Sequence, residues 1–223
     1  MKVRTLAAYQ VVHHVHPRPV TPQDEIGLVV GKAIDDCLSR FSYEVREGRH
    51  PSRAAMARLG RSFLEEGFRD ADLSLVPEEL ERIAQQLDGV LQAFRKSPAL
   101  GLPRPRTRLV LIGEEAGIYA QPDYWDTARR FYEMKSYRAV PPPPDVALQM
   151  ELFQLAFPGF ESLLLCIDRH HDPVETTVSR IPPMSPERKR EVLDMARALA
   201  LEQGEEKTLE YIDNPIVRQP LGS

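Results

Sequence analysis

Apolar residues recur at three- and four-residue spacing along the first half of the chain, a pattern typical of amphipathic helices. Each such segment begins at a proline, which suits the first turn of a helix. Residues 1–21, which contain His13, His14 and His16, lack this spacing, and we expect an irregular or extended lead-in there. Helices are predicted from Pro22 to about Glu47, from Pro51 to about Arg69 with Ala55, Leu59, Phe63 and Leu64 inward, and from Pro77 to about Lys96.

From Arg106 the pattern changes to short apolar runs bounded by turn residues, which indicates β-strands. Strands are predicted at 108–112, 118–124, 130–137, 162–167 and 175–181, with helices at 145–157 and 185–203. This mixed order favours an α/β fold. We expect one domain with an N-terminal helical elaboration (22–105), a sheet-bearing core (106–181) and a C-terminal helix and tail (185–223).

Composition and charge narrow the class of protein. The 223 residues carry a net charge of −4, which argues against a protein that coats nucleic acid non-specifically but not against an enzyme with one local binding cleft. Cys37 and Cys166 lie far apart in sequence and predict neither a disulfide framework nor a metal knuckle. Because no apolar run approaches a membrane span and no signal pattern opens the chain, we expect a cytoplasmic protein without membrane association.

The stretch with the clearest chemistry runs from Gly117 to Tyr137. Glu133 and Lys135 alternate on one strand, so their side chains share a face. Asp123 ends the preceding predicted strand, whose hairpin partner carries Glu133, and the short connection lets the two carboxylates approach. Converging carboxylates suit Mg²⁺ or Mn²⁺. A lysine beside them can orient a water molecule or stabilise charge on a phosphate.

These residues resemble a known family. Pro122-Asp123 followed by Glu133-Met134-Lys135 is similar to the PD-(D/E)xK nuclease motif, and the surroundings look most like its RecB/Cas4-type branch. The resemblance covers about half of the chain, roughly 22–47 and 106–181. It implies a restriction-endonuclease-like core with a mixed central sheet flanked by helices. It also implies Asp123, Glu133 and Lys135 as catalytic residues, with the carbonyl of Met134 as a further metal ligand.

Two more elements carry the resemblance, each with a departure. Gly31 to Asp35 resembles an early Gly-x-x-x-His element with Asp in place of His, so Asp35 is either a further metal ligand or a solvated residue beside Asp36. Gln149 to Phe153 resembles Gln-x-x-x-Tyr, with Phe153 read as a core residue and Gln149 as a candidate substrate-binding residue. Cas4-type members often hold an iron–sulfur cluster on four cysteines. Because this chain has two, no such cluster is expected.

Further substrate contacts are predicted around the hairpin. Tyr124 and Trp125 could stack on an unpaired base, although packing of Trp125 against the last helix is an equal alternative. Arg129 and Arg130 could track a phosphate backbone, as could the arginines at 104, 106 and 108, or these could form solvated faces.

The sequence therefore predicts a Mg²⁺- or Mn²⁺-dependent nuclease acting on DNA in repair, recombination or defence. The alternative is a non-catalytic nucleic-acid-binding or assembly module on a degenerate nuclease fold. Exonuclease or endonuclease action, the strand form of the DNA, and a protein partner or homo-oligomer stay open.

Overall fold

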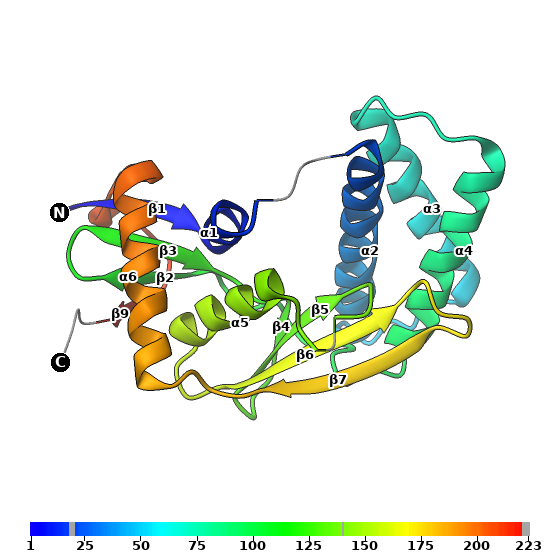
Figure 1. Cartoon of the computed structure of the whole chain (residues 1–223). Coiled ribbons are helices and arrows are strands. Elements are labelled where there is room, and N and C mark those ends of the chain that lie inside the picture. The colour runs from blue at the N-terminus through cyan, green and yellow to red at the C-terminus, as the bar shows by residue number, and fades with distance from the viewer. Residues whose placement is uncertain (18–20, 140, 220–223) are drawn as a thin grey trace.

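The computed structural model describes residues 1–17, 21–139 and 141–219, which form both helices and strands (Figure 1). The helices are α1 (Ala8–Val15), α2 (Pro22–Arg46), α3 (Arg53–Asp70), α4 (Pro77–Phe94), α5 (Pro144–Ala156) and α6 (Pro186–Gln203), with a 3-10 turn, η1 (Leu209–Tyr211). The strands are β1 (Lys2–Ala7), β2 (Arg108–Ile112), β3 (Ala116–Ala120), β4 (Tyr124–Trp125), β5 (Arg130–Lys135), β6 (Glu161–Asp168), β7 (Glu175–Ile181), β8 (Glu205–Thr208) and β9 (Ile216–Gln219).

The described strands form two mixed sheets, so the α/β class is confirmed. One sheet has the order β4-β5-β6-β7, and the other has the order β8-β1-β3-β2-β9. In the first sheet β5 and β6 run parallel and are joined through α5, while β4 and β7 pair antiparallel at the two edges. A single central sheet was expected. The strands divide between two sheets instead, because the chain leaves one sheet after β3 and enters the other at β4.

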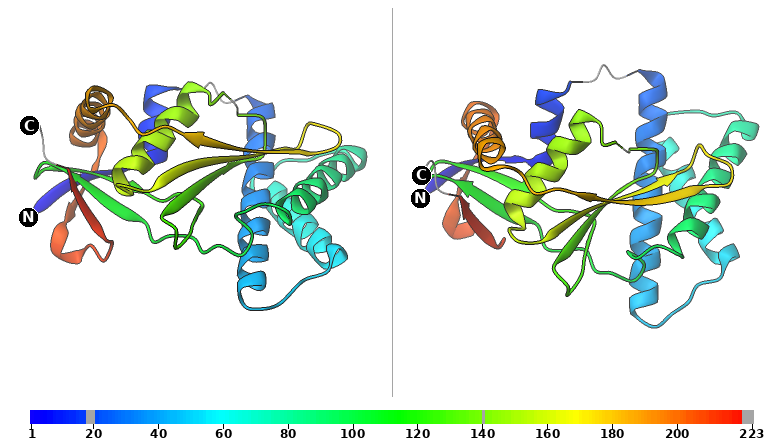
Figure 2. Two further views of the ribbon diagram at one scale, coloured as in Figure 1. Left: turned by 90° about the horizontal axis from the view of Figure 1, so that it is seen from below. Right: turned by 60° about the horizontal axis from the view of Figure 1, so that its bottom comes forward.

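Helices α2, α3 and α4 form the predicted helical part and cover one face of the β4–β7 sheet, while α5 covers the other (Figures 1 and 2). The predicted face of α2 is buried, including Ile34, Leu38 and Phe41. The buried face of α3 is rotated from the prediction to Met56, Gly60, Leu64 and Phe68. A Cβ on Gly60 would lie 2.5 Å from Cδ2 of Leu87, so glycine lets α3 and α4 approach closely here.

The second sheet lies at the opposite end of the molecule from the helical part and brings the two ends of the described chain together (Figure 1). β1 pairs with β8, so that Lys2 lies opposite Thr208. Helices α1, α5 and α6 pack on one face of this sheet and share a hydrophobic core with the α5 face of the other sheet. The opposite face carries a small cluster of Val3, Leu109 and Leu111, with Leu209 and Ile212 packed against it.

The expected irregular lead-in was wrong for the described residues 1–17, which form β1 and α1. His13 and His14 therefore lie in the last turn of a helix, and His14 Nδ1 lies 3.0 Å from Gln203 Nε2. Residues 18–20 of the lead-in and 220–223 of the tail lie outside the described residues. The expected tail also folds, into β8, η1 and β9. Across the described ranges, no helix is both long enough and apolar enough to cross a membrane.

Candidate active site

The predicted strand 118–124 is wrong at the residues that matter for the site. β3 ends at Ala120, and the chain turns through Gln121 and Pro122 before β4 begins at Tyr124. β4, not β3, is therefore the antiparallel partner of β5, with Tyr124 opposite Tyr132. Continuing this register by one and two residues places Asp123 opposite Glu133 and Pro122 opposite Met134. The expected approach of Asp123 to the strand of Glu133 is thus made across the edge of the β4–β7 sheet.

Pro122 explains why this edge is open. The Asp126 N–H donates to the Arg130 carbonyl at 3.0 Å, so residues 126 and 130 form a hydrogen-bonded pair of the antiparallel ladder. Because such pairs recur at every second residue, positions 122 and 134 fall on one, and a residue at position 122 would donate its N–H to the Met134 carbonyl. Proline has no N–H, so it cannot donate that bond. The carboxylate of Asp123 takes the other half of the ladder, because Oδ2 accepts from the Met134 N–H at 2.8 Å. The N–H and carbonyl of one strand residue point to the same side, so the Met134 carbonyl also faces this edge.

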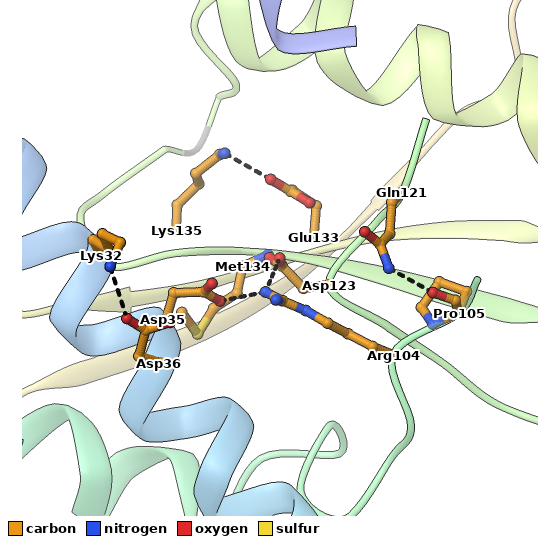
Figure 3. A network of polar contacts seen from close by, with 10 residues as sticks. All are labelled: Lys32, Asp35, Asp36, Arg104, Pro105, Gln121, Asp123, Glu133, Met134 and Lys135. Atoms are coloured by element: carbon orange, nitrogen blue, oxygen red, sulfur yellow. Dashed lines mark hydrogen bonds and ion pairs between the residues drawn. The ribbon is translucent and has the colours of Figure 1, made fainter. Parts of the chain in front are cut away.

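Glu133 and Lys135 lie on the α5 face of β5, as the two-residue alternation predicts (Figure 3). Lys135 Nζ lies 2.7 Å from Glu133 Oε1 and donates to Gln149 Oε1 on α5 at 2.8 Å. Glu133 is almost fully buried, and a buried carboxylate needs such a partner. Burial alone would lower the pKa of Lys135, but the charge and hydrogen bond of Glu133 outweigh it, so the pKa is raised. Lys135 is therefore protonated at neutral pH.

The pKa of Asp123 is raised well above its usual value. Burial is the main cause, followed by repulsion from the charges of Glu133 and Asp35. The Met134 N–H and the charge of Lys135 oppose this shift without cancelling it. A carboxyl in this environment takes up a proton more readily than a solvated one, and the repulsion between the acids also favours a cation beside them.

Arg104 lies between two of the acids, a contact that the sequence did not predict (Figure 3). Its Nη2 lies 2.6 Å from Asp35 Oδ1 and 3.3 Å from Asp123 Oδ1. The surrounding chain is fixed, since the Pro103 carbonyl accepts from the Trp125 N–H at 3.1 Å. Burial would lower the pKa of Arg104, but the hydrogen bond to Asp35 reverses this, and the pKa is raised. No spacing rule connects positions 35, 104 and 123, so the sequence held no local signal for this bridge.

The four substrate-binding candidates differ in whether they reach the acidic cluster. Gln149 reaches the site through Lys135. Tyr124 is only 1% exposed and packs on Phe94 at 5.6 Å between ring centroids, so the prediction that it stacks on a base was wrong. Arg130 pairs with Asp126 at 2.7 Å. Arg129 donates to the Pro158 carbonyl, and the contacts of the described residues bring neither arginine to the acidic cluster.

The two other aromatic predictions have clear outcomes. Phe153 is buried and meets Phe131 edge-on at 6.2 Å, which confirms it as a core residue. Trp125 stacks on Phe160 at 6.0 Å and packs against the hydrophobic cluster on the α5 side of the sheet.

The oxygen atoms at this edge of the β4–β7 sheet suit a small hard cation, but fewer side chains supply them than the sequence predicted. Among the described residues no group of three His, Cys, Asp or Glu side chains is placed to hold a metal ion. Asp35 is engaged by Arg104. What remains is the pair Asp123 and Glu133 with the Met134 carbonyl, an all-oxygen set of the kind that Mg²⁺ completes with water. The donor chemistry of this set is that of a Mg²⁺ or Mn²⁺ site, and it does not include Asp35. No family model matches the chain, and no curated protein matches it.

Proposed function

We propose that this protein hydrolyses phosphodiester bonds of DNA with Mg²⁺ or Mn²⁺, at the edge of β5. The observation that carries the proposal is the hydrogen bond from the Met134 N–H to Asp123, beside the Glu133–Lys135 ion pair. It gathers two carboxylates, one backbone carbonyl and one ammonium group at one break in a sheet edge. Asp123, Glu133 and the Met134 carbonyl would hold the cation, which would activate a bound water and neutralise charge on the phosphate.

Lys135 would act as a donor and not as a general base. Its pKa is raised, so at neutral pH it keeps its proton. Glu133 and Gln149 hold the ammonium group by two short contacts, which fixes its position on the α5 face. A fixed ammonium group can donate to the attacking water or to a phosphate oxygen, where negative charge grows during the reaction.

The order of elements supports a restriction-endonuclease-like core within the wider α/β fold. The β2–β3 hairpin leads through Pro122 into β4, β4 pairs antiparallel with β5, and α5 crosses over to β6 parallel to β5. This is the order of helix, three strands, helix and strand that the PD-(D/E)xK resemblance implies, with its second strand divided between β3 and β4.

One observation favours the non-catalytic alternative. The Arg104 guanidinium already bridges Asp35 and Asp123 and supplies positive charge where a cation would bind. A degenerate site stabilised by this bridge would have no need of a metal. The two proposals therefore differ in whether a divalent cation can displace Arg104 from Asp123.

Cleavage assays test the proposal directly. Purified protein would be incubated with labelled single- and double-stranded DNA, linear and circular, in Mg²⁺, Mn²⁺ or EDTA. We expect cleavage in Mn²⁺ or Mg²⁺, none in EDTA, and none with Asp123→Asn. Asp36→Asn is the matched control, because Asp36 is a half-buried carboxylate next to Asp35 on α2 that pairs with Lys32 at 3.4 Å instead of with Arg104.

Two results would defeat the catalytic proposal. One is cleavage by Asp123→Asn equal to that of the wild type, which would point to a contaminating nuclease. The other is a folded protein that binds DNA and cuts none of these substrates in either metal, which would favour the binding module.

A further inference from the structure

A cavity of about 660 Å³ lies between α4 and the turn that joins β6 to β7, at the end of the molecule far from α6 (Figure 1). The α4 residues that line it recur at three- and four-residue spacing from Arg82 to Ala93, so they form one stripe of the helix, and Lys96 lies just beyond the helix end. The opposite stripe, with Leu87 and Leu91, is buried in the core. The volume of the cavity falls within the usual range for small-ligand sites.

The far wall of the cavity is fixed in place. A Cβ on Gly89 would lie 2.7 Å from Cγ2 of Val174, so α4 and the end of the turn are in close contact at this glycine. At the other side of the turn, Arg169 donates from its backbone N–H to the Ser136 carbonyl at 3.4 Å and from Nη1 to Ser136 Oγ at 3.2 Å. The cavity is therefore bounded by two anchored elements.

Positive charge dominates the lining, although the whole chain is acidic. Arg82, Lys96 and Arg169 line the cavity against the single carboxylate of Asp172. Among the described residues Arg169 is in no ion pair, and Arg82 has one long ion pair, to Glu79 at 3.8 Å. Burial lowers the pKa of Arg169, and the like charge of Arg82 lowers it further. Cations that outnumber the nearby carboxylates in this way favour the binding of an anion.

The remaining polar groups suit a ligand larger than a bare ion. Gln85, Gln86 and Gln92 line the α4 side, and each amide offers both a donor and an acceptor. Arginine forks match the geometry of phosphate oxygens, and amides match sugar hydroxyls and base edges. We propose that this cavity binds a phosphate group of a nucleotide unit, supplied by a nucleic acid strand or by a free nucleotide.

The cavity and the acidic cluster are separate sites. Lys135 contacts Gln149 on α5, whereas its neighbour Ser136 contacts Arg169 at the β6–β7 turn. Binding in the cavity requires neither a metal nor cleavage. The proposal therefore stands or falls independently of the proposed nuclease activity.

Binding is measured in EDTA with three probes: inorganic phosphate, thymidine 5′-monophosphate, and a fluorescein-labelled oligothymidylate of about twelve nucleotides. The variants are Arg169→Gln and Arg82→Gln. Arg190→Gln is the matched control, because it removes the same charge from the exposed side of α6, at the other end of the molecule. We expect each cavity variant to bind roughly five- to tenfold more weakly and the control to match the wild type.

The probes identify the source of the phosphate. Tighter binding of the oligonucleotide, with strong salt dependence, assigns the cavity to a nucleic acid backbone, whereas equal binding of the monophosphate assigns it to a nucleotide. The proposal is overturned if no probe binds below about 1 mM, if both cavity variants bind like the wild type, or if Arg190→Gln loses as much affinity as they do. Arg82 is exposed, so its variant gives the answer even if Arg169→Gln fails to fold.

Discussion

Replacing Arg104 with glutamine removes the positive charge that bridges Asp35 and Asp123 and leaves three acids near one another. The lost contacts are a short hydrogen bond of 2.6 Å and a longer one of 3.3 Å. A hydrogen bond to a charged group is worth about 1.5–3 kcal/mol, and an exposed ion pair about 0–1 kcal/mol. Since the Arg104 side chain is 40% exposed, we expect a loss of about 1–2 kcal/mol at pH 7. In a chain of this length that lowers Tm by about 2–8 °C.

The loss of stability in Arg104→Gln should depend on pH in a defined direction. The folded-state pKa of Asp123 lies above its unfolded value of about 3.9, so the folded protein binds the extra proton more tightly. The contribution of Asp123 to stability is therefore fully present below the unfolded pKa and is lost as the pH rises through the folded pKa. Removing Arg104 raises that folded pKa further. The deficit of Arg104→Gln relative to the wild type should thus be larger at pH 8 than at pH 5.

The same variant separates the two proposed functions. Arg104 competes with a cation for Asp123 Oδ1, so its removal should strengthen metal binding. A ligand at one hundred times its Kd stabilises the folded state by about 2.7 kcal/mol, so the effect is visible in a thermal melt. We expect millimolar Mn²⁺ to raise the Tm of Arg104→Gln by more than it raises that of the wild type.

Arg53→Gln is the matched control, because it removes an arginine that pairs with Asp88 at 2.5 Å between α3 and α4, away from the acidic cluster. It should lower Tm without changing the response to Mn²⁺. The reasoning fails if Arg104→Gln is as stable as the wild type at pH 8, or if its response to Mn²⁺ equals that of Arg53→Gln.

Two further substitutions test the roles of single residues. Lys135→Ala and Lys135→Arg should both stay folded in Mn²⁺. Both should lose cleavage activity by a factor of about 10²–10⁴, because the position of the ammonium group matters as well as its charge. Near wild-type cleavage by Lys135→Arg would reduce the role of Lys135 to that of a counter-charge. Phe153→Tyr should lower the free energy of unfolding by about 1–3 kcal/mol, measured by urea denaturation, because Phe153 is buried in an apolar cluster and the added hydroxyl would need a partner there. Phe157→Tyr, a second buried phenylalanine of the same cluster, is its control, and unchanged stability of Phe153→Tyr alone would place that hydroxyl at a polar surface.

The elements that could be predicted from the sequence are those whose signal is local. The apolar stripe of α2 lies within one helix, and it was confirmed from Ile34 to Phe41. β1 and β8 were missed because each is stabilised by a partner some two hundred residues away, with Lys2 opposite Thr208. β8 is a short edge strand of mostly charged residues, so no apolar alternation marks it.

The candidate site also contains some residues that a local sequence pattern could place and others that depend on the tertiary fold. Two-residue alternation was sufficient to place Glu133 beside Lys135, and the 2.7 Å contact confirms it. Arg104 could not be assigned to the acids, because its position depends on how the segment after α4 crosses β4, through the contact of Pro103 with Trp125. The burial of Tyr124 was missed for a related reason. Its face of β4 is covered by Phe94 of α4, and that packing follows from the fold of the helical part.

The pairing of proline with aspartate at 122 and 123 then has a physical explanation that does not depend on the family resemblance. A proline at the last ladder position ends the pairing of β4 with β5 and leaves the Met134 carbonyl without its usual donor. The aspartate that follows accepts from the Met134 N–H through Oδ2, in place of the Pro122 carbonyl that would accept in a regular ladder. One oxygen of that carboxylate is thereby fixed against the strand, and the other, Oδ1, faces Arg104. Pro122→Ala would restore a donor for the Met134 carbonyl and allow the ladder to extend, so we expect it to weaken the response to Mn²⁺ while keeping or raising Tm in EDTA. A metal response that survives this change would show that the carbonyl is not a ligand.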